Sequence, residues 1–146
     1  MQRVDAVNFV NKYYFDAKIL ANQLKVPVEN ILGLAAHESR YGTGRIAIEN
    51  NNFFSMHAPS PLEIGQDIAH GNSKIKISKF ASFQQCGQSF IARFGSAIMG
   101  KSDLTDFAQA LVHRGYNSGD PATGGRSGYA KLLVGAIKMV KIRMTH

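Results

Sequence analysis

The residue that first suggests chemistry is Glu38, in the segment Leu34-Ala35-Ala36-His37-Glu38-Ser39-Arg40-Tyr41-Gly42. In a helix, Ile31, Leu34 and Ala35 share a face with Glu38, which puts the acid on an apolar stripe. Burial and the negative end of the helix dipole both disfavour a charged carboxylate there. We therefore expect Glu38 to hold a proton near neutral pH and to act as a general acid. The alternative is an ordinary solvated acid in the last helical turn.

A second carboxylate would complete the pair of acids that most glycoside hydrolases use. The sequence has ten acidic residues. Five of them lie on the first predicted helix or in first helical turns, where acids usually complement the helix dipole. Those that remain beside Glu38 are Glu49, Glu63, Asp67 and Asp120. Glu63 and Asp67 are the leading candidates because they belong to a predicted β-hairpin.

Other catalytic chemistries are weakly represented. His37-Glu38 begins like the zinc-binding pattern His-Glu-x-x-His, but the fifth position is Tyr41, so this helix face lacks a second ligand. The other histidines have no metal-ligand spacing, and a lone cysteine on a helix, here Cys86, is usually a packing residue. The sequence has no Walker loop, dinucleotide fingerprint or Gly-x-Ser-x-Gly motif. We expect neither a metal nor a cofactor.

Length, composition and charge favour one globular domain over residues 1–146. Hydrophobic residues make up 45% of the chain, which suffices for one core. We find no segment of the ~20 apolar residues that a membrane span needs, and the N-terminus lacks the apolar core of a signal peptide, so we expect synthesis in the cytoplasm. The net charge of +7 favours an anionic partner such as a bacterial wall. Because the basic residues are spread along the chain, we expect no nucleic acid partner.

The apolar spacing predicts helices around a small inserted hairpin. Apolar residues recur every three or four positions in residues 7–24, 90–98, 104–111 and from about 129 to 140. Pro27 opens a further helix that carries Glu38 and stops at Gly42 and Gly44, and Ser102 is expected to cap the helix over 104–111.

The hairpin is predicted from Lys74-Ile75-Lys76-Ile77-Ser78, which alternates polar and apolar residues behind the turn residues His70-Gly71-Asn72. A Gly-rich loop is expected over 117–128. The fold class is thus α+β, mainly α, with a cleft between a helical lobe and a hairpin lobe.

Several short motifs occur together in the order of one known family. They are Ala35-Ala36-His37-Glu38-Ser39-Arg40-Tyr41-Gly42, Asn52-Phe53-Phe54-Ser55-Met56, Lys79-Phe80-Ala81-Ser82-Phe83, Gly115-Tyr116 and Tyr129-Ala130-Lys131-Leu132. In this order they resemble the glucosaminidase family that includes the flagellar rod-assembly hydrolase and bacterial autolysins, glycoside hydrolase family 73. The resemblance covers roughly residues 28–140.

The resemblance implies a lysozyme-like fold and cleavage of the N-acetylglucosaminyl-β-1,4-N-acetylmuramyl bond of peptidoglycan. The general acid of the family falls on Glu38. Its second acid lies in the hairpin lobe, and counting back from Lys79-Phe80 with Gly71 in the turn places it at Asp67. Glu63 takes this role if the hairpin register differs, and substrate-assisted catalysis by the acetamido group is the alternative to both.

The resemblance also implies substrate-binding residues. Tyr116 is expected to line the sugar site, Asn52 to bond an acetamido group and Phe54 to stack on a sugar ring. Adjacent aromatic residues cannot both face the cleft, so Phe53 or Phe54 belongs to the core. Tyr41 stands where the family usually has Trp.

The sequence departs from the family pattern at several positions, which include His37, Ser55 and His57. Asp67 is shorter than the usual Glu. A longer gap to Glu38 favours a base that activates water, because inverting enzymes hold their carboxyls ~6.5–9.5 Å apart and retaining ones ~5–5.5 Å. An additional Gly-rich stretch, Ala122 to Gly128, is expected to gate the cleft or to meet a partner.

The leading hypothesis is a peptidoglycan glucosaminidase delivered into a target bacterium by a type VI secretion system, with an immunity protein that occludes its cleft in the producer. It would act in the periplasm or cell wall of the target. The enzymatic alternatives are a phage endolysin and a lytic transglycosylase or muramidase. The non-enzymatic alternative is a cationic glycan-binding or nucleic-acid-binding module.

Overall fold

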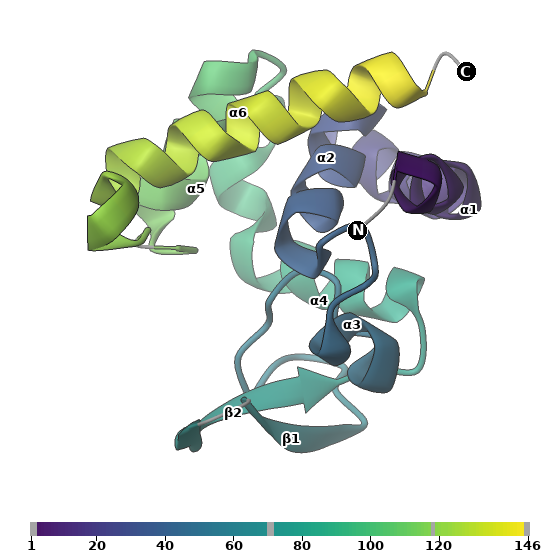
Figure 1. Cartoon of the computed structure of the whole chain (residues 1–146), viewed down its shortest axis with the longest axis vertical. Helices are drawn as coiled ribbons and strands as arrows, with labels where there is room; N and C mark the ends of the chain where they lie inside the picture. Colours follow the sequence, from purple (N-terminus) through teal and green to yellow (C-terminus); the bar gives the residue numbers. More distant parts are fainter. Residues whose placement is uncertain (1–2, 70–71, 118, 145–146) are drawn as a thin grey trace.

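The structure is a computed structural model that describes residues 3–69, 72–117 and 119–144. Within these ranges it is mainly helical, with a two-stranded antiparallel sheet (Figure 1). The helices are α1 (Arg3–Leu24), α2 (Val28–Ser39), α3 (Arg45–Asn50), α4 (Phe83–Ile98), α5 (Leu104–Arg114) and α6 (Gly125–Arg143), with a short 3-10 helix η1 (Pro121–Thr123). The strands are β1 (Gly65–Ala69) and β2 (Asn72–Lys79). The predicted fold class, α+β and mainly α, is confirmed.

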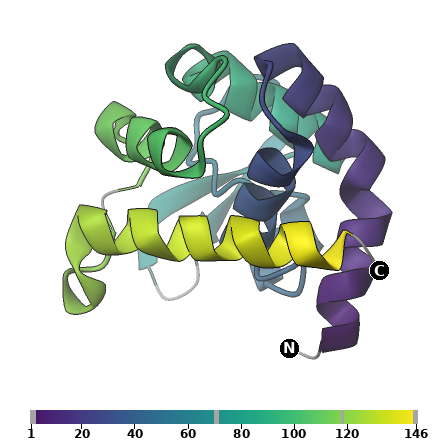
Figure 2. The same cartoon turned by 90° about the horizontal axis from the view of Figure 1, so that it is seen from above.

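Helix α2 is the centre of the core. Every residue from Asn30 to Ala36 is buried, and α2 packs against both α1 and α6. Its apolar surface is therefore wider than the single stripe that the sequence predicted. The views in Figures 1 and 2 show α6 crossing α2. The crossing is close at Gly33, where an added Cβ would lie 2.7 Å from the Cα of Ile137.

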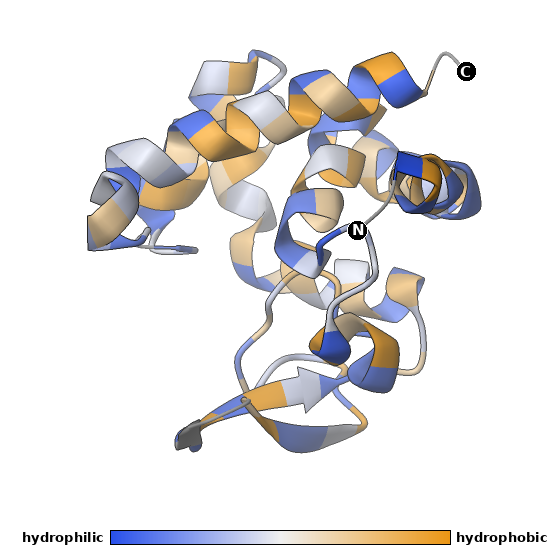
Figure 3. Ribbon diagram, viewed as in Figure 1, coloured by the Kyte–Doolittle hydropathy of each residue, from blue (hydrophilic) through white to orange (hydrophobic). Residues whose placement is uncertain are grey.

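Phenylalanines fill the space between α2, α4 and the segment that precedes the hairpin. Phe54, Phe80, Phe90 and Phe107 are almost completely buried, and the rings of Phe54 and Phe90 stack at 5.0 Å between centroids. Burial of each such side chain contributes roughly 1.5–3 kcal/mol. Figure 3 shows hydrophobic and hydrophilic residues alternating along α6, as expected for a helix with one face in the core.

The hairpin forms where it was predicted, and it lies at the end of the molecule away from α6 (Figure 1). Gly65 pairs with Lys79 and Asp67 pairs with Ile77. The predicted turn residues His70 and Gly71 lie outside the described residues. Helix α3, just before the hairpin, was not predicted.

Three predicted boundaries were wrong. Asp103, not Ser102, caps α5, because its carboxylate accepts a hydrogen bond from the Asp106 backbone N–H at 3.0 Å. The last helix begins at Gly125 rather than near Tyr129. The stretch from Ala122 to Gly128 is therefore not an open loop, because it forms most of η1 and the first turn of α6.

Candidate active site

Glu38 lies in the last turn of α2 and is half-buried. The helix ends directly after it, because Ser39 donates its hydroxyl to the Ala35 carbonyl at 2.6 Å and accepts the Gly42 N–H at 2.9 Å. Arg40 then adopts a left-handed conformation with φ of 53°. The buried helix and this tight exit fix where the Glu38 carboxylate emerges from the core. The protonation of Glu38 stays a prediction.

The Glu38 side chain faces a cavity of about 420 Å³ between the end of α2, helix α3 and the hairpin. The described residues that line it include Arg40, Arg45, His57 and Ile77. Glu38 is the one carboxylate among those described lining residues. The cavity therefore pairs a single acid with polar and basic groups, and it lies where the predicted cleft between the lobes was expected.

Two tyrosine hydroxyls flank Glu38 on the side of α6. Tyr129 donates its hydroxyl proton to Oε2 of Glu38 at 2.9 Å, and Tyr116 donates to the Phe54 carbonyl at 2.5 Å. Burial and then the charge of Glu38 raise the pKa of both tyrosines. Both hydroxyls consequently stay protonated. Tyr129 was quoted in a family motif but was not predicted as a site residue, although it makes the direct contact.

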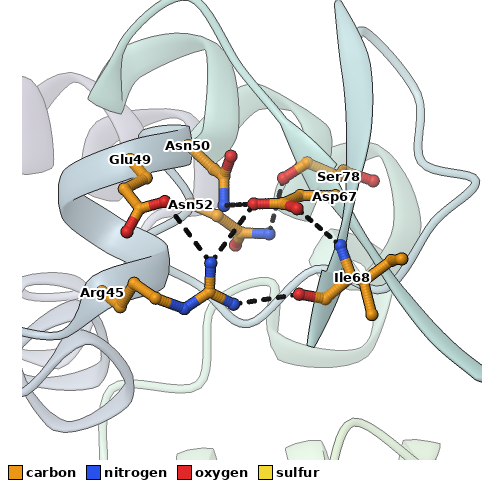
Figure 4. A network of polar contacts seen from close by, with 7 residues as sticks. All are labelled: Arg45, Glu49, Asn50, Asn52, Asp67, Ile68 and Ser78. Atoms are coloured by element: carbon orange, nitrogen blue, oxygen red, sulfur yellow. Dashed lines mark hydrogen bonds and ion pairs between the residues drawn. The ribbon is translucent and has the colours of Figure 1, made fainter. Parts of the chain in front are cut away.

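Asp67 is held by a network at the inner end of the hairpin (Figure 4). Its Oδ1 accepts the Ile68 N–H at 2.7 Å, and its Oδ2 accepts from Asn50 at 3.1 Å and from Arg45 at 3.3 Å. The bond from Ile68, followed by those from Asn50 and Arg45, lowers the pKa of Asp67 below its usual range. Asp67 is thus ionised at neutral pH.

The pairing of the hairpin and the hydrogen bonds of Glu63 show that Asp67 and Glu63 are associated with opposite faces of the sheet. Asp67 pairs with Ile77, and directly paired residues of antiparallel strands lie on the same face. Ile77 lines the cavity beside Glu38. Its neighbour Ser78 must point to the opposite face, and the Ser78 hydroxyl donates to Glu63 at 2.8 Å. Asp67 is not itself among the residues that line the cavity, but its pairing puts it on the same face of the sheet as Ile77, and Glu63 is tied to the other face.

Both carboxylate oxygens of Glu63 accept hydrogen bonds from neighbouring residues. Oε1 accepts the Ser60 N–H at 2.7 Å as well as the Ser78 hydroxyl, and Oε2 accepts from Gln66 at 2.8 Å. Burial is the largest single effect on the pKa of Glu63 and raises it, but these hydrogen bonds and the charge of Arg93 together outweigh burial and lower the pKa. Glu63 fastens the segment before β1 to the hairpin.

Two predicted substrate-binding residues have their side chains in the core. Phe54 is 0% exposed, so its ring cannot stack on a sugar, and Phe53 is buried as well. Asn52 lines the cavity, but its amide group donates to the carbonyls of Met56 and Ser78 at 2.9 and 3.0 Å and its oxygen accepts the Met56 N–H. The prediction for Phe54 was wrong, and the Asn52 amide has no donor left for an acetamido group.

Tyr41 is not among the residues that line the cavity. Its ring packs edge-on against Phe9, and its hydroxyl accepts a hydrogen bond from Arg143 at 2.5 Å. Tyr41 therefore joins α1 to the end of α6. Tyr116 is not among the residues that line the cavity either, and its role at the sugar site stays a prediction.

Nucleophile and metal chemistry find no support in the described residues. Cys86 is completely buried, and burial raises the pKa of its thiol to about 12, so it is not a nucleophile at neutral pH. Within residues 3–69, 72–117 and 119–144, no three His, Cys, Asp or Glu side chains form a metal-binding group. In the same ranges, no helix combines the length and apolarity that a bilayer crossing requires.

Comparison with known families gives one clear match. A family model described as mannosyl-glycoprotein endo-beta-N-acetylglucosaminidase, or Glucosaminidase, matches residues 15–142. No curated protein matches the chain.

Solved structures resemble the chain over nearly its whole length. A chain in a type VI secretion system effector-immunity complex from Pseudomonas protegens is 51% identical, with a TM-score of 0.88 and coverage of 99% of this chain and 96% of that one. A peptidoglycan hydrolase from Sphingomonas sp. A1 is 25% identical, with a TM-score of 0.77 and coverage of 95% and 93%. A C-terminally truncated glycoside hydrolase domain of FlgJ from Salmonella typhimurium, at 23% identity, a TM-score of 0.67 and coverage of 94% and 98%, shares the fold.

Proposed function

Because the chain belongs to the glucosaminidase family, we propose that it hydrolyses the N-acetylglucosaminyl-β-1,4-N-acetylmuramyl bond of peptidoglycan, with Glu38 as the general acid. Residues 1–146 act as one catalytic domain. The observation that carries the proposal is the Glu38 carboxylate at the end of a buried helix, on a cavity, with Tyr129 bonded to one of its oxygens.

Tyr129 gives Glu38 a defined orientation for proton transfer. A protonated carboxyl has one donor oxygen and one acceptor oxygen. Because the Tyr129 hydroxyl donates to Oε2, Oε1 is the oxygen left to carry the transferable proton in this proposal. Oε1 then gives this proton to the glycosidic oxygen as the bond to the anomeric carbon breaks.

Asp67 serves as the general base in this proposal. Two observations support this role: its lowered pKa keeps it ionised, and it pairs with Ile77, which lines the cavity. Asp67 takes a proton from a water molecule whose oxygen bonds to the anomeric carbon, and the leaving sugar keeps the proton from Glu38. Asn50 and Arg45 hold the base in place.

The biological setting that we propose is that of an antibacterial effector. The support is the 51% identity to a chain in a type VI secretion system effector-immunity complex. The protein would be delivered to the periplasm or cell wall of a target bacterium and would meet peptidoglycan glycan strands there. In the producer, a cognate immunity protein would occlude the cleft.

The chemistry of the new chain ends tests this proposal. Purified sacculi are digested with the protein, and the products are identified by mass spectrometry before and after borohydride reduction. We expect reducing N-acetylglucosamine ends. Reducing N-acetylmuramic acid ends would indicate a muramidase, 1,6-anhydromuramyl ends a lytic transglycosylase, and no new ends a glycan-binding module.

A further inference from the structure

A second and larger cavity, of about 1140 Å³, lies between α5 and α6 near the end of α4. None of the residues that line it also lines the cavity at Glu38. Small, partly exposed side chains form part of its surface, at Ala97, Ala110 and Ala130. Figure 1 places α5 and α6 at the opposite end of the molecule from the hairpin. We call this cavity the α5–α6 groove.

The α5–α6 groove is strongly basic. Lys101, Arg114, Arg126 and Lys131 line it, against Asp106 as the acidic lining residue. All four basic side chains are exposed. None of the four forms an ion pair with any residue in the described part of the chain. The groove thus concentrates positive charge that the described residues leave uncompensated.

We propose that the α5–α6 groove binds the peptide stems of peptidoglycan and so acts as an accessory wall-binding surface. This proposal rests on the proposed function, because the substrate itself brings the ligand. Stem peptides are short, rich in alanine and carry free carboxylates. Their charge is complementary to the basic rim, and their methyl side chains suit a surface of alanines.

Binding of stems outside the catalytic cavity would hold the enzyme on an insoluble polymer between cleavage events. A glycan strand carries many stems, so engagement of one raises the effective concentration of the next bond at Glu38. Charge attraction between exposed groups is screened over about 8 Å at physiological ionic strength. Wall binding through the groove should therefore weaken steeply as salt increases.

The test uses the full chain with Glu38→Gln, so that binding to sacculi is measured without digestion. The groove variant adds Arg126→Glu and Lys131→Glu. The matched control adds Lys12→Glu and Lys18→Glu, which change the same charge on the exposed side of α1. Thermal unfolding by circular dichroism confirms that all three proteins are folded.

We expect the groove variant to bind intact sacculi roughly tenfold more weakly than its parent, and the control within about twofold. On soluble glycan strands from which an amidase has removed the stems, parent and groove variant should bind equally. Equal losses in the groove variant and the control, or a loss that persists on stem-free glycans, would overturn the proposal. The proposal would also be overturned if the groove substitutions weakened binding of an acidic protein to the groove but left binding to sacculi unchanged.

A second measurement separates this proposal from the proposed function. The groove substitutions are placed in the enzyme with native Glu38, and the release of products from short, stem-free glycan fragments is followed. We expect equal rates for the groove variant and the wild type. If the wild-type enzyme releases product neither from these fragments nor from intact sacculi, the proposed function fails, whereas the sacculus-binding result still decides the role of the groove.

Discussion

Replacement of Tyr129 by Phe tests whether the hydrogen bond to Glu38 directs the proton. The substitution keeps the buried ring and removes the hydroxyl that donates to Oε2 at 2.9 Å. Without that donor, neither oxygen of Glu38 is reserved for the transferable proton. The loss should appear in kcat and much less in KM, because the contact acts on the reacting group.

The expected fall in kcat follows from the strength of the hydrogen bond between Tyr129 and Glu38. Glu38 becomes charged as it gives up its proton in the transition state, and a hydrogen bond to a charged group contributes about 1.5–3 kcal/mol. If the whole contribution is lost in the transition state, kcat falls about 10- to 100-fold, since each 1.36 kcal/mol is one factor of ten. The free energy of unfolding should change by only about 1 kcal/mol, because the ring still fills its site.

The assay measures steady-state release of reducing ends from soluble glycan strands. Tyr13→Phe is the matched control: Tyr13 lies on α1, where its ring stacks on Phe83 at 4.5 Å, and it is not among the residues that line the cavity. We expect normal kcat for Tyr13→Phe. Equal kcat values for the two variants would refute the role assigned to Tyr129.

Three further outcomes follow from the structure. Asp67→Asn should abolish turnover while Glu63→Gln retains it, as measured on sacculi; retention in both variants would point to substrate-assisted catalysis. Because the pKa of Cys86 is raised to about 12, its thiol is protonated at a pH of about 8, so iodoacetamide should label it only after unfolding, and rapid labelling of the native protein would contradict its burial. Gly33→Ala should lower the free energy of unfolding by about 1–3 kcal/mol, because the added Cβ meets the backbone of α6 at 2.7 Å. Gly135→Ala, which has open space around the added atom, should not lower it.

The helices and the strand that could be predicted are those marked by a pattern of residues close together in the sequence. The period of 3.6 placed the long helices, and the alternation in Lys74-Ile75-Lys76-Ile77-Ser78 placed strand β2. Helix α3 spans six residues, which is too short for a period to be recognised. Capping residues adjacent in sequence, such as Ser102 and Asp103, differ only in backbone geometry, and the sequence cannot distinguish them.

The position of Glu38 at the end of a buried helix could be predicted from the sequence, but the residues that surround it could be predicted only in part. Glu38 follows a run of buried residues and ends a helix, and both features can be recognised in the sequence. Its partner Tyr129 is 91 positions away, so only the packing of α6 on α2 brings the two together. Phe54 was assigned to the substrate from a motif, but a motif does not specify the direction of a side chain, and this one points into the core.

The choice between Asp67 and Glu63 required the register of the hairpin. Both acids precede the turn, and their order in the sequence does not say which face of the sheet each one occupies. The pairing of Asp67 with Ile77 and the bond of Glu63 to Ser78 place them on opposite faces. A shift of one residue in the pairing would have moved Asp67 to the other face.

The measurement that tests the central claim most directly is the turnover of sacculi by Glu38→Gln. The substitution keeps the size and the hydrogen-bonding shape of the side chain and removes its ability to donate a proton as an acid. The account predicts a protein with the thermal unfolding profile of the wild type that still binds sacculi and releases no reducing N-acetylglucosamine ends. Release of these ends at the wild-type rate would contradict it.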